Sequence, residues 1–562
     1  MANKIQIQSS PALATMVEQA GPILDDTDAV IQKAVGMVKN NVYTDGKFDQ
    51  KKFDRFQKHC YTLAVAKAEL QAARALLKHA KSIPGANPSD LLHATAVYFC
   101  ADVVKSVLGT YASGGSALGV FRPHVAELLA SKDVTVWLDA VDATCEHIAS
   151  TCMETGTLQL PAGLSEEQEL VRDTFRRFAD EVVAPRAEEI HRQDLDIPEE
   201  ILRPAAELGC FGTCIPERFG GLQPDDKPDS LGMIIVTEEL SRGSLGAAGS
   251  LITRPEIAAR ALLAGGTETQ QQRWLPVLAS GEKLCAISIT EPDTGSDVAA
   301  VSLKATAVEG GWLLNGSKTW CTFAGRSELI VVLARSNDQP GHKGLSLFVV
   351  DKPAYPGHEF RHQQEQGGSL SGRAIATLGY RGMHSFDLFF ENYFVPADGL
   401  IGEQAGEGKG FYYTMAGFAG GRLQTAARAT GVMQAALEQA MRYAGDRRIF
   451  QQPLAGFALT KNKLSRMLAT VTAARQFSYA VAAEMDEGRG QMEASLVKLF
   501  SCRAAEWVTR EAMQLHGGMG YAEESAVSRY FADARVLSIF EGAEEVLAIR
   551  VIARELVEQS GQ

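Results

Sequence analysis

The segment Thr290-Glu291-Pro292-Asp293-Thr294-Gly295-Ser296-Asp297 lies where the pattern of the chain changes from helical to extended. Just before it, residues 285–290 alternate between apolar and polar side chains, which is typical of a strand. The segment itself is a turn in which free backbone N–H groups and the Ser296 hydroxyl can cradle a pyrophosphate. A turn of this composition is more often only a turn, so its meaning depends on the residues around it.

A second informative segment, Lys318 to Thr322, follows the tight-turn signal Gly310-Gly311. Trp320 and Thr322 have the same parity in an extended chain, so both side chains can face one site. A Trp ring can cover an aromatic cofactor, and a Thr hydroxyl can bond a ring nitrogen. The alternative for Trp320 alone is a strand residue in a hydrophobic core.

Two further strands, Leu329 to Ala334 and Leu345 to Val350, complete a small β-domain that ends near Pro396. Helical patterns lie on both sides of it, and strands do not alternate with helices. A doubly wound sheet is therefore disfavoured, and we expect an α+β protein, mainly helical, with a central antiparallel β-domain.

The helical regions divide into three parts. Residues 1 to about 152 resemble a bundle of their own, in which Lys47 to Lys81 predicts one long amphipathic helix. Helical sequence resumes at Ser165 and again from about residue 410. The predicted units are 1–160, an N-terminal helical extension; 161–284, a helical domain; 285–400, the β-domain; and 401–562, a C-terminal helical bundle.

Composition excludes several classes of protein. The chain has 562 residues and a formal net charge of -13, which argues against a nucleic-acid binder. No stretch approaches the roughly 18 apolar residues that a membrane span needs, and the first six residues lack the apolar core of a secretory signal. The nine cysteines are scattered and odd in number, which suits a reducing compartment. We therefore expect a soluble cytoplasmic protein.

Two other motifs are weak. His358-Glu359-Phe360-Arg361-His362 matches a zinc-protease pattern, but that pattern requires a helix. The prolines and glycines on both sides predict a solvated loop, and we expect no metal site. The glycine-rich segment 406–410 follows no β-α-β unit, so a Rossmann dinucleotide site is weakly supported.

Near the C-terminus, Glu541 follows the apolar pair Ile539-Phe540 and precedes Gly542. A partly buried carboxylate in a cleft is a plausible proton acceptor near neutral pH. The alternative is a Glu at a helix start, favoured by the macrodipole.

Together these segments resemble the acyl-CoA dehydrogenase family over roughly residues 165–560. The matching stretches are Pro216 to Gly221, Thr290 to Val298, Asn315 to Lys318, Trp320 to Thr322, Leu333 to Ser336, Gly517 to Gly520, Phe540 to Gly542 and Ile552 to Leu556. The resemblance implies a helical domain, an antiparallel β-domain and a C-terminal four-helix bundle, here with an extra N-terminal helical bundle.

The resemblance also implies FAD and its contacts. Thr290, Trp320 and Thr322 match residues at the flavin ring, with Thr322 near N5. Ser296 matches a contact of the FAD pyrophosphate and the substrate pantetheine. The remaining expected FAD contacts are Arg447 and Phe450 at the pyrophosphate, Gln514 and Gly518 at the adenosine across a subunit interface, and Glu545 as a hydrogen-bond acceptor.

The implied reaction is α,β-dehydrogenation of an acyl-CoA thioester. Glu541 takes the α-proton, and its backbone N–H and a flavin ribityl hydroxyl stabilise the thioester oxygen, while the β-hydrogen leaves as hydride to flavin N5. Gly421 carries no carboxylate, so the base position of some branched-chain relatives is empty, and Arg422 matches a substrate-side arginine near CoA. The implied partners are an electron-transfer flavoprotein and further copies of the chain, as a dimer or tetramer.

Departures from the family pattern are Ala419 where an Asp often contacts CoA, Ile449 where Thr is common, and Ala543 and Glu545 after the catalytic Glu.

The extension, together with Leu378 to Phe386 and Gly417 to Thr425, resembles the branch that acts on a short branched dicarboxylic acyl-CoA, converting (2S)-methylsuccinyl-CoA to mesaconyl-CoA in the ethylmalonyl-CoA pathway. A buried substrate carboxylate needs a cation or several donors. A helix over 246–264 is expected to line the acyl pocket, where Ser250, Thr253 and Arg254 lie. Arg254 is the first candidate partner of the carboxylate and Arg260 the second; the alternative is that both arginines are exposed.

Other functions stay open at this point. They are a dehydrogenase for another short or branched acyl-CoA, an acyl-CoA oxidase of the same fold, and a non-catalytic scaffold with a vestigial flavin site.

Overall fold

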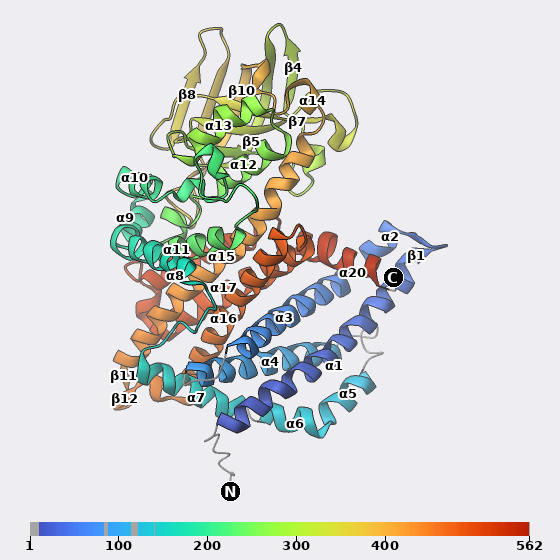
Figure 1. Cartoon of the computed structure of the whole chain (residues 1–562), viewed down its shortest axis with the longest axis vertical. Coiled ribbons are helices and arrows are strands. Elements are labelled where there is room, and N and C mark those ends of the chain that lie inside the picture. Colours follow the sequence, from blue (N-terminus) through green and yellow to red (C-terminus); the bar gives the residue numbers. More distant parts are fainter. Residues whose placement is uncertain (1–9, 84–87, 114–121, 140, 561–562) are drawn as a thin grey trace. The chain divides into compact units, whose positions relative to one another are not determined.

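The computed structural model describes residues 10–83, 88–113, 122–139 and 141–560 (Figure 1). The expectation about a secretory signal concerns residues 1–6, which lie outside this part of the chain. The chain divides into two compact units, which are taken separately. One holds residues 1–167, 432–484 and 490–562, and the other holds residues 168–431 and 485–489.

The first unit begins with three long helices that pack on one another, α1 (Ser10–Val42), α3 (Gln57–Ser82) and α4 (Pro88–Ser113) (Figure 1). Three shorter helices follow: α5 (Arg122–Ala130), α6 (Lys132–Asp139) and α7 (Val141–Thr155). The helix α4 is long and apolar enough to cross a membrane, contrary to the expectation from sequence. Most of its apolar stretch is buried inside the unit, as in the core helix of a folded domain.

The predicted helix from Lys47 to Lys81 is wrong at its start. A short hairpin, β1 (Tyr43–Thr44) and β2 (Lys47–Phe48), and the single turn α2 (Gln50–Phe53) precede α3. The hairpin turn is Asp45-Gly46, and both residues have positive φ. An Asp-Gly pair is a strong two-residue turn signal, and here it overrides the helical pattern of its surroundings.

The first unit also contains the C-terminal helices. These are the end of α15 (Gly410–Asp446), then α16 (Ala458–Asp486), α17 (Gln491–His516), α18 (Ala526–Leu537), α19 (Glu544–Val546), a π-helical segment Leu547–Ala553, and α20 (Arg554–Gln559). The helix α3 packs on α17 and on the π-helical segment, and α1 packs on α20. The N-terminal helices therefore share one compact unit with the C-terminal helices, where the sequence suggested a bundle of their own.

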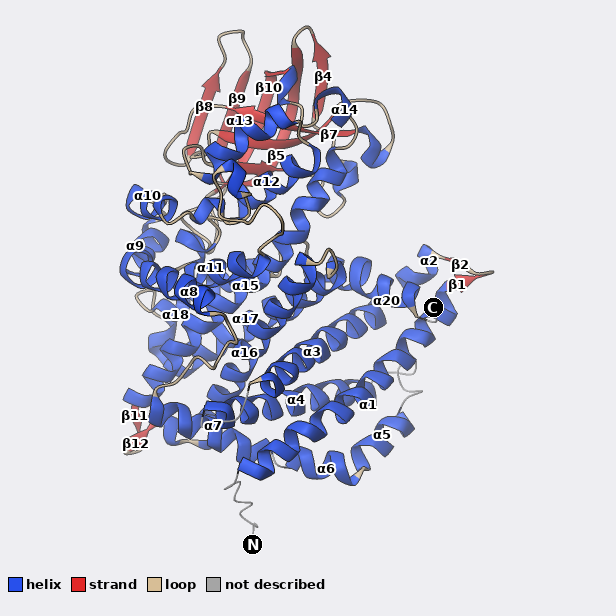
Figure 2. Ribbon diagram, in the orientation of Figure 1, coloured by secondary structure: helices blue, strands red, loops and turns tan. Residues whose placement is uncertain are grey.

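The second unit combines helices with a sheet. Its helices are α8 (Glu166–Phe178), α9 (Ala184–Gln193), α10 (Glu199–Glu207), α11 (Ser230–Gly243), α12 (Thr253–Gly265) and α13 (Glu268–Ala279), with α14 (Glu403–Gly406) and the first part of α15 after the sheet. The strands gather into one eight-stranded sheet (Figure 2). They are β3 (Cys285–Ser288), β4 (Lys304–Val308), β5 (Gly311–Thr322), β6 (Leu329–Arg335), β7 (Leu345–Asp351), β8 (Glu359–Gln363), β9 (Ser369–Ala374) and β10 (Ser385–Pro396).

The strand order is β3-β6-β4-β5-β10-β9-β8, and β7 pairs with β6. Most pairs are antiparallel, but β3 and β4 each pair with β6 in parallel. The prediction of a mainly helical α+β fold with a central β-domain is confirmed. The predicted loop over 358–362 is wrong, because Glu359–Gln363 forms β8, where the buried Phe360 alternates with exposed neighbours.

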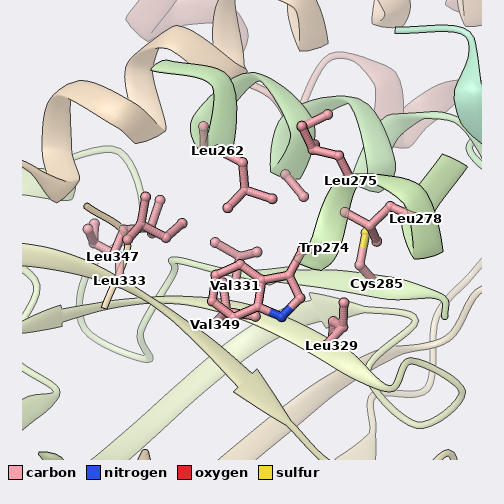
Figure 3. Close-up of a cluster of buried hydrophobic side chains, with 14 of the residues drawn as sticks. Leu262, Trp274, Leu275, Leu278, Cys285, Leu329, Val331, Leu333, Leu347 and Val349 are labelled. Carbon is pink, nitrogen blue, oxygen red and sulfur yellow. The ribbon is translucent and has the colours of Figure 1, made fainter. Parts of the chain in front are cut away.

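One hydrophobic cluster fixes the strands to the helices of this unit. Figure 3 shows Leu262 of α12 and Trp274 and Leu275 of α13 facing Val331 of β6 and Val349 of β7. Each fully buried side chain of this size contributes on the order of 1.5–3 kcal/mol by leaving water. The cluster also includes Cys285 and Ile289, so it holds the strand that leads into the turn at Thr290.

Candidate functional site

A β-bulge at the end of β5 turns Trp320 outward. The register between β5 and β10 shifts so that Thr319 and Trp320 both oppose Asp387, which is the arrangement of a bulge. Trp320 has a φ of 56° and is 55% exposed, whereas the next residue, Cys321, is fully buried. The core alternative for Trp320 is thus excluded, and an exposed indole lies beside the half-buried Thr322, whose hydroxyl is 2.9 Å from that of Ser385.

A buried ion pair anchors the turn that contains Thr290 and Ser296. The Lys318 ammonium, fully buried, donates to Glu291 at 2.9 Å and to the Ile289 carbonyl at 2.8 Å. The Glu291 carboxylate also accepts from the backbone N–H groups of Ser302 and Leu303. Burial acts to raise the pKa of Glu291, but the Lys318 charge and these hydrogen bonds outweigh it and lower the pKa.

This pair places the predicted flavin-side residues next to one another. The Thr319 N–H donates to the Thr290 carbonyl at 2.9 Å, which joins the turn to β5 one residue before Trp320. Ser296 lies exposed at the tip of the same turn. Sequence reasoning did not assign a role to Glu291 and Lys318; the available signal was a lysine inside an otherwise strand-like segment.

The predicted helix over 246–264 is wrong in its first half. Residues Leu245–Gly249 form a π-helical turn, and α12 starts only at Thr253. The glycines explain the break. A side chain at Gly246 would collide with the backbone of Arg381, and one at Gly249 would collide with Ser241. The backbone therefore approaches its neighbours closely, and Ser250 is left in the turn before α12.

Arg254 is buried at the start of α12, with 6% of its surface exposed. Its guanidinium donates to the Tyr380 hydroxyl at 2.7 Å and to the Ser250 carbonyl, and it lies 3.4 Å from the Met383 sulfur. No carboxylate lies within ion-pair distance of it in the part of the chain that the structure describes. Arg260, the second candidate, instead pairs with buried Glu256 at 2.8 Å. Arg254 is therefore not exposed, and the alternative that both arginines are exposed is excluded.

Other polar groups surround Arg254. The Ser250 hydroxyl accepts from Arg428 of α15 at 2.9 Å, and Thr253 Oγ1 is buried without a hydrogen-bond partner. Sequence reasoning missed Tyr380 and Arg428. Tyr380 lies in a stretch that carried the family resemblance, but nothing local predicts that its hydroxyl reaches Arg254. Arg422, also on α15, is half-buried.

In the first unit, Glu541 lies on the loop between α18 and α19. It has a φ of 52°, and Gly542 has a φ of 95°. Such a conformation is costly for a residue with a side chain and persists only where the surroundings enforce it, which is common at active sites. The Glu541 Oε2 atom is buried without a hydrogen-bond partner. A carboxylate oxygen left in this state is suited to bind a group from outside the chain.

The other predicted cofactor residues of this unit lie elsewhere. Arg447 and Phe450 belong to a hairpin of β11 (Arg448–Ile449) and β12 (Gln452–Pro453), and Phe450 is 88% exposed. Gln514 and Gly518 are exposed at the end of α17, and the stacking of Tyr443 on His516 at 4.3 Å joins that end to α15. The Glu541 loop is attached near residue 503, roughly 16 Å from residue 514 along the axis of α17. Glu545 is exposed on α19.

The residues that could together bind a metal ion differ from those of the zinc-protease pattern, His358 to His362. His358 and His362 are separated by roughly 13 Å along β8 and cannot share an ion. His358, His384 and Asp194 do gather, with ligand atoms within 4.8 Å of one another. However, His384 already bonds Asp194 and Asp196 through its two ring nitrogens, and the Arg381 guanidinium lies 3.6 Å from Asp194. Both ring nitrogens of His384 and the Asp194 carboxylate therefore already have partners within the chain.

Comparisons with known proteins cover nearly the whole chain. Family models for the acyl-CoA dehydrogenase N-terminal, middle and C-terminal domains match residues 165–282, 286–393 and 408–557. The (2S)-methylsuccinyl-CoA dehydrogenase of Cereibacter sphaeroides is 37% identical over 560 residues, which are 98% of this chain and 99% of that protein. The glutaryl-CoA dehydrogenase of Desulfococcus multivorans is 32% identical over 395 residues, 70% of this chain and 97% of that protein.

Solved structures agree. The butyryl-CoA dehydrogenase of Megasphaera elsdenii has a TM-score of 0.64 and 31% identity, covering 70% of this chain and 98% of that one. A glutaryl-CoA dehydrogenase in complex with glutaryl-CoA also has a TM-score of 0.64 and 31% identity, covering 70% of this chain and 96% of that one. The first relative therefore aligns with the N-terminal helices as well, whereas the others cover about the length of the three matched domains.

Proposed function

We propose that this chain, which belongs to the acyl-CoA dehydrogenase family, oxidises (2S)-methylsuccinyl-CoA to mesaconyl-CoA. The family assignment makes it an FAD-dependent oxidoreductase that acts on the CH–CH bond of an acyl-CoA. The specific substrate is the part that is proposed. It is supported by an alignment with a methylsuccinyl-CoA dehydrogenase that includes the N-terminal helices, and by Arg254.

The residues present fit FAD. Trp320 offers an exposed indole next to the Thr322 hydroxyl, and Ser296 lies on the adjoining turn. A large exposed aromatic ring beside polar groups is a typical contact of a flat cofactor. We assign Thr290, Trp320 and Thr322 to the flavin ring and Ser296 to the pyrophosphate. When bound, FAD supplies the acceptor of the hydride that leaves the β-carbon.

A second group of predicted cofactor residues comprises Arg447, Phe450, Gln514 and Gly518. We assign this group to the pyrophosphate and adenosine of the FAD that is bound to a second copy of the chain, with Glu545 as a hydrogen-bond acceptor. Gln514 and Gly518 lie at the end of α17, roughly 16 Å along its axis from the point where the Glu541 loop is attached, whereas Glu545 lies next to that loop on α19. A homo-oligomer in which each copy completes the cofactor site of the other accounts for the exposure of this group and for its distance from the Glu541 loop.

Glu541 is the proposed base. Among the described residues its buried Oε2 has no hydrogen-bond partner, so the α-proton of a bound thioester can be transferred to it without breaking an existing hydrogen bond. The left-handed backbone at this position fixes the direction of the side chain. Arg422 is proposed to lie near CoA, as in the family pattern.

The single observation that carries the substrate assignment is the state of Arg254. It is a buried cation whose bonded partners are neutral: a tyrosine hydroxyl, a carbonyl and a thioether. Burying a charge without a counter-charge is costly. A substrate with a distal carboxylate removes that cost, whereas a monocarboxylic acyl chain cannot. Ser250 and Thr253 provide further polar contacts.

The test is to replace Arg254 with alanine and compare two substrates. We expect kcat/KM for (2S)-methylsuccinyl-CoA to fall at least about 100-fold, because one partner of a buried charge pair is lost. The value for butyryl-CoA should stay within about threefold. Arg273→Ala, which removes an exposed arginine of α13, serves as the control. Equal losses on both substrates would remove Arg254 from the role.

A second variant tests the base. Glu541→Gln should bind FAD normally but no longer show bleaching of the flavin absorbance on mixing with substrate. Retained bleaching would move the base to another residue. Within the same proposal, an electron-transfer flavoprotein is the electron acceptor and the chain is cytoplasmic. Rapid turnover with oxygen alone would favour the acyl-CoA oxidase alternative instead.

A further inference from the structure

The loop that carries Glu541 is attached to α17 at three points. Ser538, before Glu541, donates its hydroxyl proton to Glu506 at 2.5 Å. The Gly542 carbonyl, directly after Glu541, accepts from the Lys498 ammonium at 2.6 Å. Glu544, at the start of α19, accepts from Arg503 at 2.6 Å. The three partners lie within about two turns of one helix, so α17 determines where the loop begins and ends.

A fourth contact comes from the N-terminal helices. The Tyr61 hydroxyl of α3 donates to the Glu544 carboxylate and accepts from the Arg503 guanidinium. Arg503 also lies over the Tyr61 ring, 5.7 Å from its centroid. Burial and the hydrogen bond to Glu544 raise the pKa of Tyr61 to about 12. The hydroxyl therefore stays protonated near neutral pH and remains a donor to Glu544.

The same side of the loop is held by a second pair. Asp54, just before α3, forms an ion pair of 2.9 Å with Arg550 in the π-helical segment that follows α19. Since α3 packs directly on that segment, the chain after Glu541 lies against the extension over several residues.

We propose that Tyr61 is a positioning residue for Glu541, and that one role of the N-terminal extension is to fix the conformation of this loop. The inference rests on the proposed role of Glu541 as the base. Glu541 holds a left-handed backbone conformation that its surroundings must enforce. Glu544 is only three residues away, and its other side-chain partner, Arg503, has 40% of its side chain exposed. The Tyr61 hydroxyl orders both members of that pair at once.

The first experiment uses Tyr61→Phe, which keeps the ring and removes only the hydroxyl. The measurement is the rate of flavin reduction after rapid anaerobic mixing with (2S)-methylsuccinyl-CoA. We expect reduction to slow about 10-fold, because small displacements of a catalytic group are costly, while FAD content, melting temperature and the Kd of the substrate stay unchanged. A rate within twofold of the wild type would overturn the proposal.

The matched control is Glu146→Gln. Glu146 of α7 also bonds a C-terminal helix from the extension, through Lys461 of α16, but that contact is not part of the loop. We expect it to leave the reduction rate unchanged. An equal slowing in both variants would mean that general packing of the extension is responsible, which contradicts a specific role of Tyr61.

A double-mutant cycle provides the second test. In a Glu544→Ala background the Tyr61 hydroxyl has no carboxylate to hold, so adding Tyr61→Phe should cause no further slowing. Multiplicative losses would overturn the proposal. Failure of the proposed function is distinguishable, because it would appear as retained flavin reduction in Glu541→Gln, whatever Tyr61→Phe does.

Discussion

Trp320 and Arg254 belong to the same compact unit, but the fold exposes the first side chain and buries the second. The Trp320 ring is 55% exposed and is turned outward by a bulge. Arg254 is 6% exposed, and its guanidinium donates to acceptors of the protein itself, the Ser250 carbonyl and the Tyr380 hydroxyl. A single exposed ring is common on a protein surface, so its significance here comes from the bulge that turns it outward. A buried cation is the uncommon case for an arginine.

The difference indicates which part of the site depends on a ligand for its burial. On the proposed flavin side, the apolar surface of Trp320 would be covered only when a cofactor binds. On the proposed acyl side, the polar groups are ordered in advance, and the substrate would have only to supply an anion. Cofactor binding should therefore be sensitive to single exposed rings, whereas substrate selectivity should be sensitive to buried charges and to the hydroxyl groups that orient them.

The largest expected effect concerns the buried charges beneath the exposed ring. Lys318→Met removes the cation that Glu291 faces in a dry environment. We expect the free energy of unfolding to fall by about 3–5 kcal/mol, because breaking one half of a buried pair leaves an uncompensated charge. Denaturant unfolding measures this. The control is Lys283→Met, which removes a part-exposed pair with Asp351 and should cost less than about 1 kcal/mol. Equal losses would contradict the interpretation.

Much of this region was predictable from sequence because the pattern is local. The alternation at residues 285–290 and the signal at Gly310-Gly311 predicted strands that the structure confirms as β3 and the β4–β5 turn. The helical sequence predicted from about residue 410 includes α16 and α17, whose helical spacing continues over many turns. Long periodic segments carry enough repeated information to fix the element type.

The errors arise where distant contacts decide the local structure. The turn before α12 exists because Gly246 and Gly249 lie against Arg381 and Ser241, and helical spacing alone does not contain that information. The strand β8 forms because β9 offers a partner, although its own sequence resembles a loop. In the site, residue types predicted Trp320 and Glu541, but the contacts of Arg254 with Tyr380 and of Tyr61 with Glu544 join segments more than a hundred residues apart.

The next prediction tests the exposed side of the comparison. Trp320→Ala should weaken FAD binding about 10-fold, since stacking of a flat ring on an aromatic side chain contributes roughly 1–3 kcal/mol. The measurement is a titration of the FAD-free protein, followed by flavin fluorescence. Phe389→Ala removes another exposed ring of the same sheet, on β10, and should leave FAD affinity unchanged. A similar loss in both variants would mean that exposure alone, not position, is responsible.

A smaller effect is expected from Tyr380→Phe on the acyl side. The variant removes the hydroxyl that accepts from Arg254 at 2.7 Å, so the guanidinium loses one of the contacts that orient it. We expect the KM for (2S)-methylsuccinyl-CoA to rise about fivefold, the size of one ordinary hydrogen bond, with kcat little changed. Tyr412→Phe, at an exposed tyrosine bonded to His342, is the control. An unchanged KM in Tyr380→Phe would show that Arg254 is held by its other contacts.

The smallest effect concerns a buried charge that titrates. Burial acts to lower the pKa of His384, but its hydrogen bond with Asp196 and the charges of Asp194 and Asp196 outweigh that and raise the pKa above its ordinary value of 6.5. A raised pKa means that the folded state binds the proton more tightly than the unfolded state does. The stabilisation is therefore complete below pH 6.5 and is lost as the pH rises through the folded-state pKa. The Arg381 guanidinium, 3.6 Å from Asp194, also pairs with that carboxylate and reduces its effect on His384. The His358 ring lies next to the His384 ring, with 4.2 Å between the centroids.

His384→Gln should remove this dependence. The wild type should lose free energy of unfolding as the pH is raised from 6 towards 9, and the variant should lose less over the same range. Urea unfolding at a series of pH values measures the slope directly. His342→Gln, at an exposed ring bonded to Tyr412, should retain the slope of the wild type. If the wild type and His384→Gln have parallel profiles, then Asp194 and Asp196 do not hold an extra proton on His384 in the folded protein.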